Sequence, residues 1–133
     1  MQQVVLGFPA TAESVAPARQ RMAVFLTDAG AAPELVDDCR IVLTEAVTNA
    51  VLHAYNGTPG AIQVEFVIES DGAVSIAVAD DGAGWQEDSA RRTGGRGMGV
   101  IRSLTTRCDV VRRQCGGTEV RMWLGEGPDT RDA

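Results

Sequence analysis

Three polar side chains, Glu45, Asn49 and His53, recur at every fourth position in the segment from Pro33 to Ala54. In a helix, each is rotated by only about 40° from the one before it, so the three form one polar stripe along one face. A stripe made of a carboxylate and an amide, in place of Lys–Glu pairs, favours the wall of a ligand site. The alternative is an ordinary solvated helix face.

The opposite arc of the same helix is apolar and predicts contact with the core. Its members are Leu43, Ala46, Val47, Ala50, Val51 and Ala54. Because half of them are alanines, the helix can approach a sheet closely.

A carboxylate stands where an expected strand ends and a glycine turn begins. Asp80 closes that strand, and Gly82 and Gly84 follow it. An acid in this position can reach into a pocket and accept hydrogen bonds, for which the exocyclic amine of a purine is a suitable donor.

A second glycine segment opens a short helix. It contains Gly95, Arg96, Gly97, Met98 and Gly99. Backbone N–H groups at such a helix start can bind phosphates without any Lys. The spacing is not GxGxxG, so the dinucleotide-binding fingerprint is absent, and tight turns alone are the alternative interpretation.

The basic residues exclude several chemistries. All 12 are Arg, and no Lys occurs. A Walker-type phosphate loop, a protein-kinase-type ATP site and Schiff-base catalysis all need a Lys. The only histidine is His53, which argues against an HExxH zinc site, and without a GxSxG turn a Ser-His-Asp triad is improbable.

Length and charge indicate one acidic globular domain. The chain has 133 residues, 44% of them hydrophobic, and a net charge of −6. The segment 91–113 is locally basic, with seven Arg against Asp109. An acidic protein is repelled by nucleic acid, so this cluster favours nucleotide phosphates or an acidic protein partner, and a solvated surface is the alternative.

Cysteine use and the N-terminus favour a cytoplasmic protein. Cys39, Cys108 and Cys115 show no CxxC spacing, which predicts buried, reduced thiols and neither a disulfide framework nor a zinc site. The N-terminal residues lack a signal-peptide pattern, and the chain contains no run of 18 apolar residues.

Hydrophobic periodicity predicts a two-layer α/β sandwich over residues 1–125, with a mixed or antiparallel sheet and helices on one face. Helices are expected from Thr11 or Ser14 to about Asp28, from Pro33 to about Ala54, and near Met98–Leu104. Strands are expected over 3–8, 62–68, 74–78, 107–114 and 118–124, with a turn at Asp71-Gly72. Residues 126–133 are polar and predict a disordered tail.

Three segments together resemble the three ATP-binding boxes of the GHKL superfamily. They are residues 45–55 (EAVTNAVLHAY), Asp80-x-Gly82-x-Gly84 and Gly95-x-Gly97-x-Gly99. Three further segments are similar to those of the small anti-sigma-factor serine kinases of bacteria. They are the motif TNAxxHAY, the N-terminal segment Phe8-Pro9-Ala10 and the C-terminal segment Gly117-Thr118-Glu119-Val120. The resemblance spans about residues 4–124 and implies the Bergerat-type ATP-binding fold.

The resemblance also implies roles for single residues. Asn49 would coordinate the Mg²⁺ that bridges the phosphates of ATP, and Glu45 would be the general base. Asp80 would bind the adenine amine, and Thr118 would support the adenine end. The glycines of the two segments would lie against the nucleotide, together with Arg96 and Met98. Arg91 and Arg92 are further candidate phosphate partners, and His53 either lines the pocket or braces the helix end.

The implied activity is ATP-dependent phosphorylation of a serine on a STAS-domain anti-anti-sigma factor, by a homodimer that also sequesters a sigma factor. No direct contact with nucleic acid or membrane is expected. One alternative is a nucleotide-gated binding module without kinase activity. Another is a sensor histidine kinase fragment, which would need a dimerising helix upstream.

Overall fold

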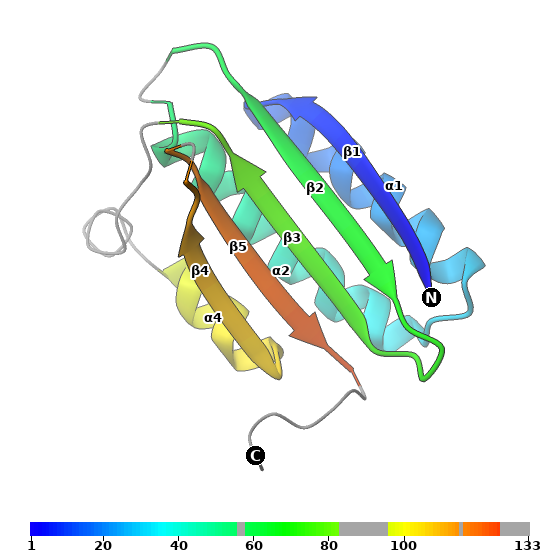
Figure 1. Ribbon diagram of the computed structural model, residues 1–133. Coiled ribbons are helices and arrows are strands. Elements are labelled where there is room, and N and C mark those ends of the chain that lie inside the picture. The colour runs from blue at the N-terminus through cyan, green and yellow to red at the C-terminus, as the bar shows by residue number, and fades with distance from the viewer. Residues whose placement is uncertain (56–57, 83–95, 115, 126–133) are drawn as a thin grey trace.

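Among the residues that the structure describes, five strands form one sheet in the order β1-β2-β3-β5-β4, and three α-helices pack on one of its faces (Figure 1). The computed structural model describes residues 1–55, 58–82, 96–114 and 116–125. The strands are β1 (Gln2–Pro9), β2 (Ala61–Ile68), β3 (Val74–Asp80), β4 (Arg107–Arg112) and β5 (Thr118–Leu124). The helices are α1 (Val15–Asp28), preceded by the 3-10 turn η1 (Ala12–Ser14), then α2 (Pro33–His53) and α4 (Arg96–Leu104).

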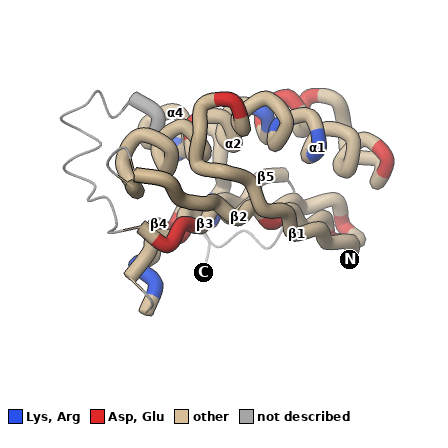
Figure 2. Tube along the Cα trace, turned by 90° about the horizontal axis from the view of Figure 1, so that it is seen from above, with Lys and Arg blue, Asp and Glu red and all other residues tan. Residues whose placement is uncertain are grey.

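The two layers are plain in the view from above, where the helices lie on one side and the strands on the other (Figure 2). This confirms the predicted α/β sandwich. Every strand pairing is antiparallel, which decides between the mixed and antiparallel alternatives. The chain leaves β3 through α4, forms the edge strand β4, and returns as β5 between β4 and β3.

The core lies between the sheet and the helices. Phe66 and Ile76 on the strands and Leu26 and Leu43 on the helices are almost fully buried, each at 1% exposure or less. On α2, the predicted apolar arc is buried as expected, except that Val51 is only half-buried. Burial of this arc fixes the rotation of α2, and therefore the direction in which its polar stripe faces.

The hairpin between β2 and β3 turns at Asp71-Gly72, as predicted. Gly72 has a φ of +92°, a conformation that glycine adopts without strain. The Asp71 carboxylate accepts a hydrogen bond from the N–H of Ala73 at 2.9 Å, which stabilises the turn.

One predicted helix cap and two predicted element boundaries differ from the structure. Thr11 and Ser14 contact each other at 3.3 Å through their hydroxyls, and neither side chain caps a helix. The strand β4 ends at Arg112 instead of residue 114 because the N–H of Arg113 already bonds the carbonyl of Gly117 to close a tight turn. Helix α4 begins at Arg96, two residues early, so Gly97 and Gly99 lie within it.

The cysteine prediction is confirmed for one residue and wrong for another. Cys39 is fully buried, and burial, reinforced by the charge of Asp38, raises the pKa of its thiol to about 12. Cys108 is half-buried, because it lies on the edge strand β4. Cys115 and the expected tail 126–133 lie outside the described residues. Within the described part of the chain, no helix is long and apolar enough to cross a membrane.

Candidate functional site

Asp80 is a buried carboxylate at the end of a central strand. It is 3% exposed and lies opposite Thr118 of β5, which is 4% exposed. Burial raises the pKa of Asp80, whereas hydrogen bonds from the backbone N–H groups of Gly82 and Thr118 lower it; the charge of Asp81 raises it again and that of Arg113 lowers it. A buried carboxylate has two oxygens and can accept further bonds, so Asp80 can bind an amine brought to it by a ligand.

The turn that follows Asp80 packs tightly on the end of α2. A Cβ at Gly82 would lie 2.0 Å from the carbonyl oxygen of Ala54, so no larger residue fits without a backbone shift. The hydroxyl of Tyr55 accepts a hydrogen bond from the N–H of Asp81 at 2.9 Å. The turn and the helix end therefore form one unit, which explains the need for glycine at position 82.

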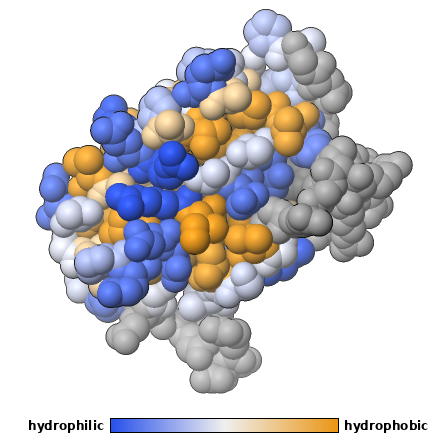
Figure 3. All heavy atoms as spheres, turned by 180° about the vertical axis from the view of Figure 1, so that it is seen from behind, coloured by the Kyte–Doolittle hydropathy of each residue, from blue (hydrophilic) through white to orange (hydrophobic). Residues whose placement is uncertain are grey.

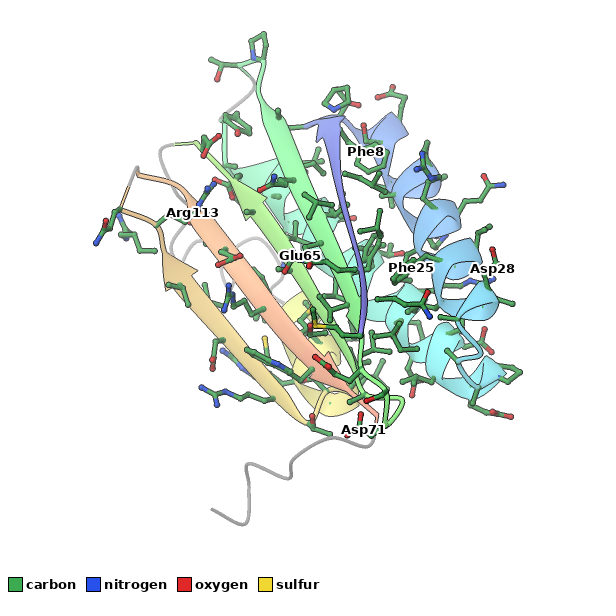
Figure 4. The ribbon with its side chains drawn as sticks, turned by 45° about the vertical axis from the view of Figure 1, so that its right-hand side comes forward. Phe8, Phe25, Asp28, Glu65, Asp71 and Arg113 are labelled. Atoms are coloured by element: carbon green, nitrogen blue, oxygen red, sulfur yellow. The ribbon has the colours of Figure 1, made fainter. Side chains whose placement is uncertain are left out.

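On its other side, the same turn meets the hairpin between β4 and β5. A Cβ at Gly117 would lie 1.7 Å from the carbonyl oxygen of Asp80. Arg113 donates from Nη1 to that carbonyl oxygen at 3.1 Å and to Oδ1 of Asp81 at 2.7 Å. Figure 4 shows Arg113 at this end of the sheet. The basic segment 91–113 was the only sequence signal for this contact, which was not predicted.

The polar stripe of α2 supplies a second set of groups. Glu45, Asn49 and His53 are all half-buried, as one helix face beside a buried arc requires. Within the described residues, Nδ2 of Asn49 is buried and has no hydrogen-bond partner. A buried amide without a partner costs roughly 1–3 kcal/mol, so this group is suited to receive a ligand.

Glu45 can be reached from outside the molecule. It borders an open hollow of about 460 Å³ between α1 and α2, which Arg19 and Arg40 also line. The surface on this side of the molecule mixes polar and apolar side chains, and Val24 and Ile41 are among the exposed apolar residues (Figure 3). A proton acceptor at this place can meet a hydroxyl that a second molecule brings.

The predicted glycine segment is only partly described. Met98 is 4% exposed and packs in the core, so its side chain holds α4 on the sheet. Gly99 is exposed within the helix, and Arg96 and Gly97 form its first turn. The other predicted residues of this region lie outside the described residues; they are Gly84, Arg91, Arg92 and Gly95.

Binding of a divalent cation would depend on the nucleotide. The described residues contain no group of three or more His, Cys, Asp or Glu side chains that could hold a metal ion. Mg²⁺ commonly takes one or two protein oxygens together with substrate phosphates and waters. The side-chain oxygen Oδ1 of Asn49 is a ligand of that kind, whereas Nδ2, which has no partner in the described residues, is a hydrogen-bond donor and suits an acceptor oxygen of the ligand.

The fold is an α/β sandwich in which a buried carboxylate, Asp80, is followed by a glycine turn that packs on the end of α2. The family described as "Histidine kinase-like ATPase domain" matches residues 8–124. This chain belongs to that family.

Curated relatives include regulators of sigma factors. The chain is 35% identical over 122 residues to the anti-sigma F factor of Geobacillus thermodenitrificans, covering 91% of this chain and 77% of the relative. It is 26% identical to the anti-sigma F factor of Bacillus cytotoxicus, with 88% of each chain covered. It is 31% identical to the serine-protein kinase RsbW of Staphylococcus aureus, covering 78% of this chain and 76% of that one.

Solved structures show the same fold. The RsbU and RsbW domains of a Mycobacterium tuberculosis protein match with a TM-score of 0.73 at 22% identity, covering 93% of this chain and 32% of that longer chain. The histidine kinase domain of a blue-light activated kinase from Erythrobacter litoralis matches with a TM-score of 0.60 at 23% identity, covering 83% of this chain and 60% of that one.

Proposed function

We propose that this chain is an anti-sigma factor that binds Mg·ATP and transfers its γ-phosphoryl group to a serine of a STAS-domain anti-anti-sigma factor. The observation that carries the proposal is the buried carboxylate of Asp80, placed with its glycine turn against the end of the helix that bears the unpartnered amide of Asn49. The relatives named anti-sigma F factor and serine-protein kinase support the regulatory role.

In this proposal, the adenine end of the nucleotide lies at the end of the sheet. Asp80 accepts a hydrogen bond from the adenine amine, and Thr118 supports the base from β5. A purine with a carbonyl oxygen in place of that amine would set an acceptor against the carboxylate, so the site would discriminate against guanine. Gly97 and Gly99 carry no side chain, so the phosphates could approach the backbone at these two positions near the start of α4.

Phosphoryl transfer needs alignment and charge neutralisation more than covalent chemistry. Bound Mg²⁺ would supply the neutralising charge, with Asn49 as its protein ligand. Glu45 would accept the proton of the serine hydroxyl while the serine oxygen bonds to the γ-phosphorus and the bond to the β-phosphate oxygen breaks. The products are a phosphoserine and ADP. Two copies of the chain would form a homodimer, and nucleotide state would decide whether it holds the sigma factor or the antagonist.

The test is transfer of label from γ-labelled Mg·ATP to STAS-domain proteins of the same genome. Label on a serine of one of them is the expected result. The Glu45→Ala variant should bind ATP almost as the native protein does and transfer label about 10²–10⁴-fold more slowly, the usual contribution of a positioned base. Bound nucleotide without any labelled protein would contradict the kinase and support a binding module. Unchanged transfer by the variant would remove Glu45 from its role.

A further inference from the structure

Arg113 bonds to two oxygens of the turn after β3, although it lies 33 positions from Asp80 in the chain. We propose that Arg113 is a positioning residue of the adenine end: it fixes the backbone that carries Asp80 and holds the carboxylate of Asp81 away from the base. The inference rests on the proposed function, because it assigns a role to Arg113 in the same nucleotide site.

Asp80 is held by hydrogen bonds at two points. The direction of the Asp80 carboxylate depends on the turn, because its Oδ1 accepts from the N–H of Gly82 at 3.1 Å. The carbonyl oxygen of Asp80 accepts from Arg113, so the residue is held at both its side chain and its main chain. Loss of the guanidinium would remove the two side-chain hydrogen bonds that Arg113 donates to the carbonyl oxygen of Asp80 and to the carboxylate of Asp81.

The main chain of the β4–β5 hairpin also lies close to the main chain of the turn. Gly117 lies so near the Asp80 carbonyl that a Cβ would come within 1.7 Å of it. Gly116 has a φ of +103°, and its N–H donates to the carbonyl of Arg113 at 3.0 Å. This tight turn sets the position of the main chain from which the Arg113 side chain reaches the oxygens of β3.

The ion pair of Arg113 also acts on the charge next to Asp80. Asp80 and Asp81 are adjacent carboxylates, and Asp81 is 69% exposed at its side chain. The ion pair with Arg113, at 2.7 Å, draws the Asp81 carboxylate toward the hairpin. Only Asp80 is then left buried at the base, with a single negative charge that favours the amine of adenine. A partly exposed pair contributes little to folding, so its effect should appear in binding and not in stability.

The test compares the dissociation constants of Mg·ADP and Mg·GDP in the full chain and its variants. Arg113→Gln should weaken ADP binding by about tenfold, which is the usual effect of a lost charge-assisted hydrogen bond, and should lower the preference for ADP over GDP. In the transfer assay, KM for ATP should rise while kcat changes little. Arg113→Lys keeps the charge without the planar fork, and should recover part of the affinity.

Arg121→Gln is the matched control. Arg121 also pairs with a carboxylate, that of Glu119 at 3.1 Å, but it lies in the middle of β5 opposite Ala77, three positions before Asp80. This variant should bind ADP as the native chain does; an equal loss in it would overturn the proposal, as would ADP binding by Arg113→Gln within twofold of the native value. If Arg113→Gln does not melt cooperatively, Arg113→Lys takes its place, and ADP affinity in that variant equal to the native value overturns the proposal. Native protein that binds no ADP would instead refute the proposed function.

Discussion

At the scale of single residues, Asp80 and Asn49 are the two groups of the site that burial leaves at a cost in stability. Burial disfavours the charged form of the Asp80 carboxylate. The side-chain nitrogen Nδ2 of Asn49 is buried and has no hydrogen-bond partner in the described structure. A ligand that bonds to both groups would offset part of this loss of stability. Stability and binding therefore oppose each other at these positions.

The pH dependence of stability tests the state of Asp80. Its pKa is raised above the ordinary value of 3.8, chiefly by burial. Below pH 3.8 the residue is protonated in both the folded and the unfolded chain. As the pH rises through the native pKa, the folded state loses stability, because the unfolded chain releases its proton first.

The Asp80→Asn variant cannot lose this proton. We therefore compare the free energy of unfolding of the variant with that of the unsubstituted chain. The difference, variant minus unsubstituted, should increase between pH 3.8 and the pKa of Asp80 in the folded state, by about 1.4 kcal/mol for each pH unit by which that pKa is raised. Urea unfolding measured from pH 3 to pH 7 gives this difference. A difference that stays constant, or that falls with rising pH, would show that burial does not raise the pKa of Asp80.

At the scale of elements, the site is where three backbones approach one another. The end of α2 meets the turn after β3 at Gly82, and the hairpin between β4 and β5 meets it at Gly117. Because main-chain atoms are in contact at both places, the site is held by rigid elements and not by long side chains.

The Gly117→Ala variant tests this packing. The added Cβ would overlap the carbonyl oxygen of Asp80, so a strand must shift, and the free energy of unfolding should fall by about 1–3 kcal/mol. Gly7→Ala is the control, since a Cβ there meets nothing within 4 Å, and its effect should stay within about 0.5 kcal/mol. Equal effects of the two substitutions in urea unfolding would contradict the close approach.

Much of these elements could be predicted from local patterns. The helical period of α2 separates the polar stripe with Glu45 and Asn49 from the buried arc. The pair Asp71-Gly72 marks the hairpin between β2 and β3, because glycine alone readily takes a φ near +90°. The contact of Arg113 with Asp81 could not be predicted in this way. It depends on β5 lying between β3 and β4, a pairing that no local pattern specifies.

At the scale of the whole molecule, the strand order collects the site at one end of the sheet. Asp71, in the hairpin between β2 and β3, and Arg113 lie at opposite ends of the strands (Figure 4). Among the described residues, those proposed to bind adenine, or to position the residues that bind it, come from β3, β5 and the β4–β5 hairpin. Those proposed to bind Mg²⁺ or to accept the proton come from α2. A nucleotide that reaches both sets must lie across the two layers.

Calorimetric titration with ADP in the presence of Mg²⁺ tests this central claim most directly. One ADP should bind per chain, and Asn49→Ala should weaken that binding by about tenfold or more, because a metal ligand is lost. Binding by the variant should also lose most of its dependence on Mg²⁺. The absence of any heat from the native chain with Mg·ADP would contradict the claim, as would equal affinity of the native chain and the Asn49→Ala variant.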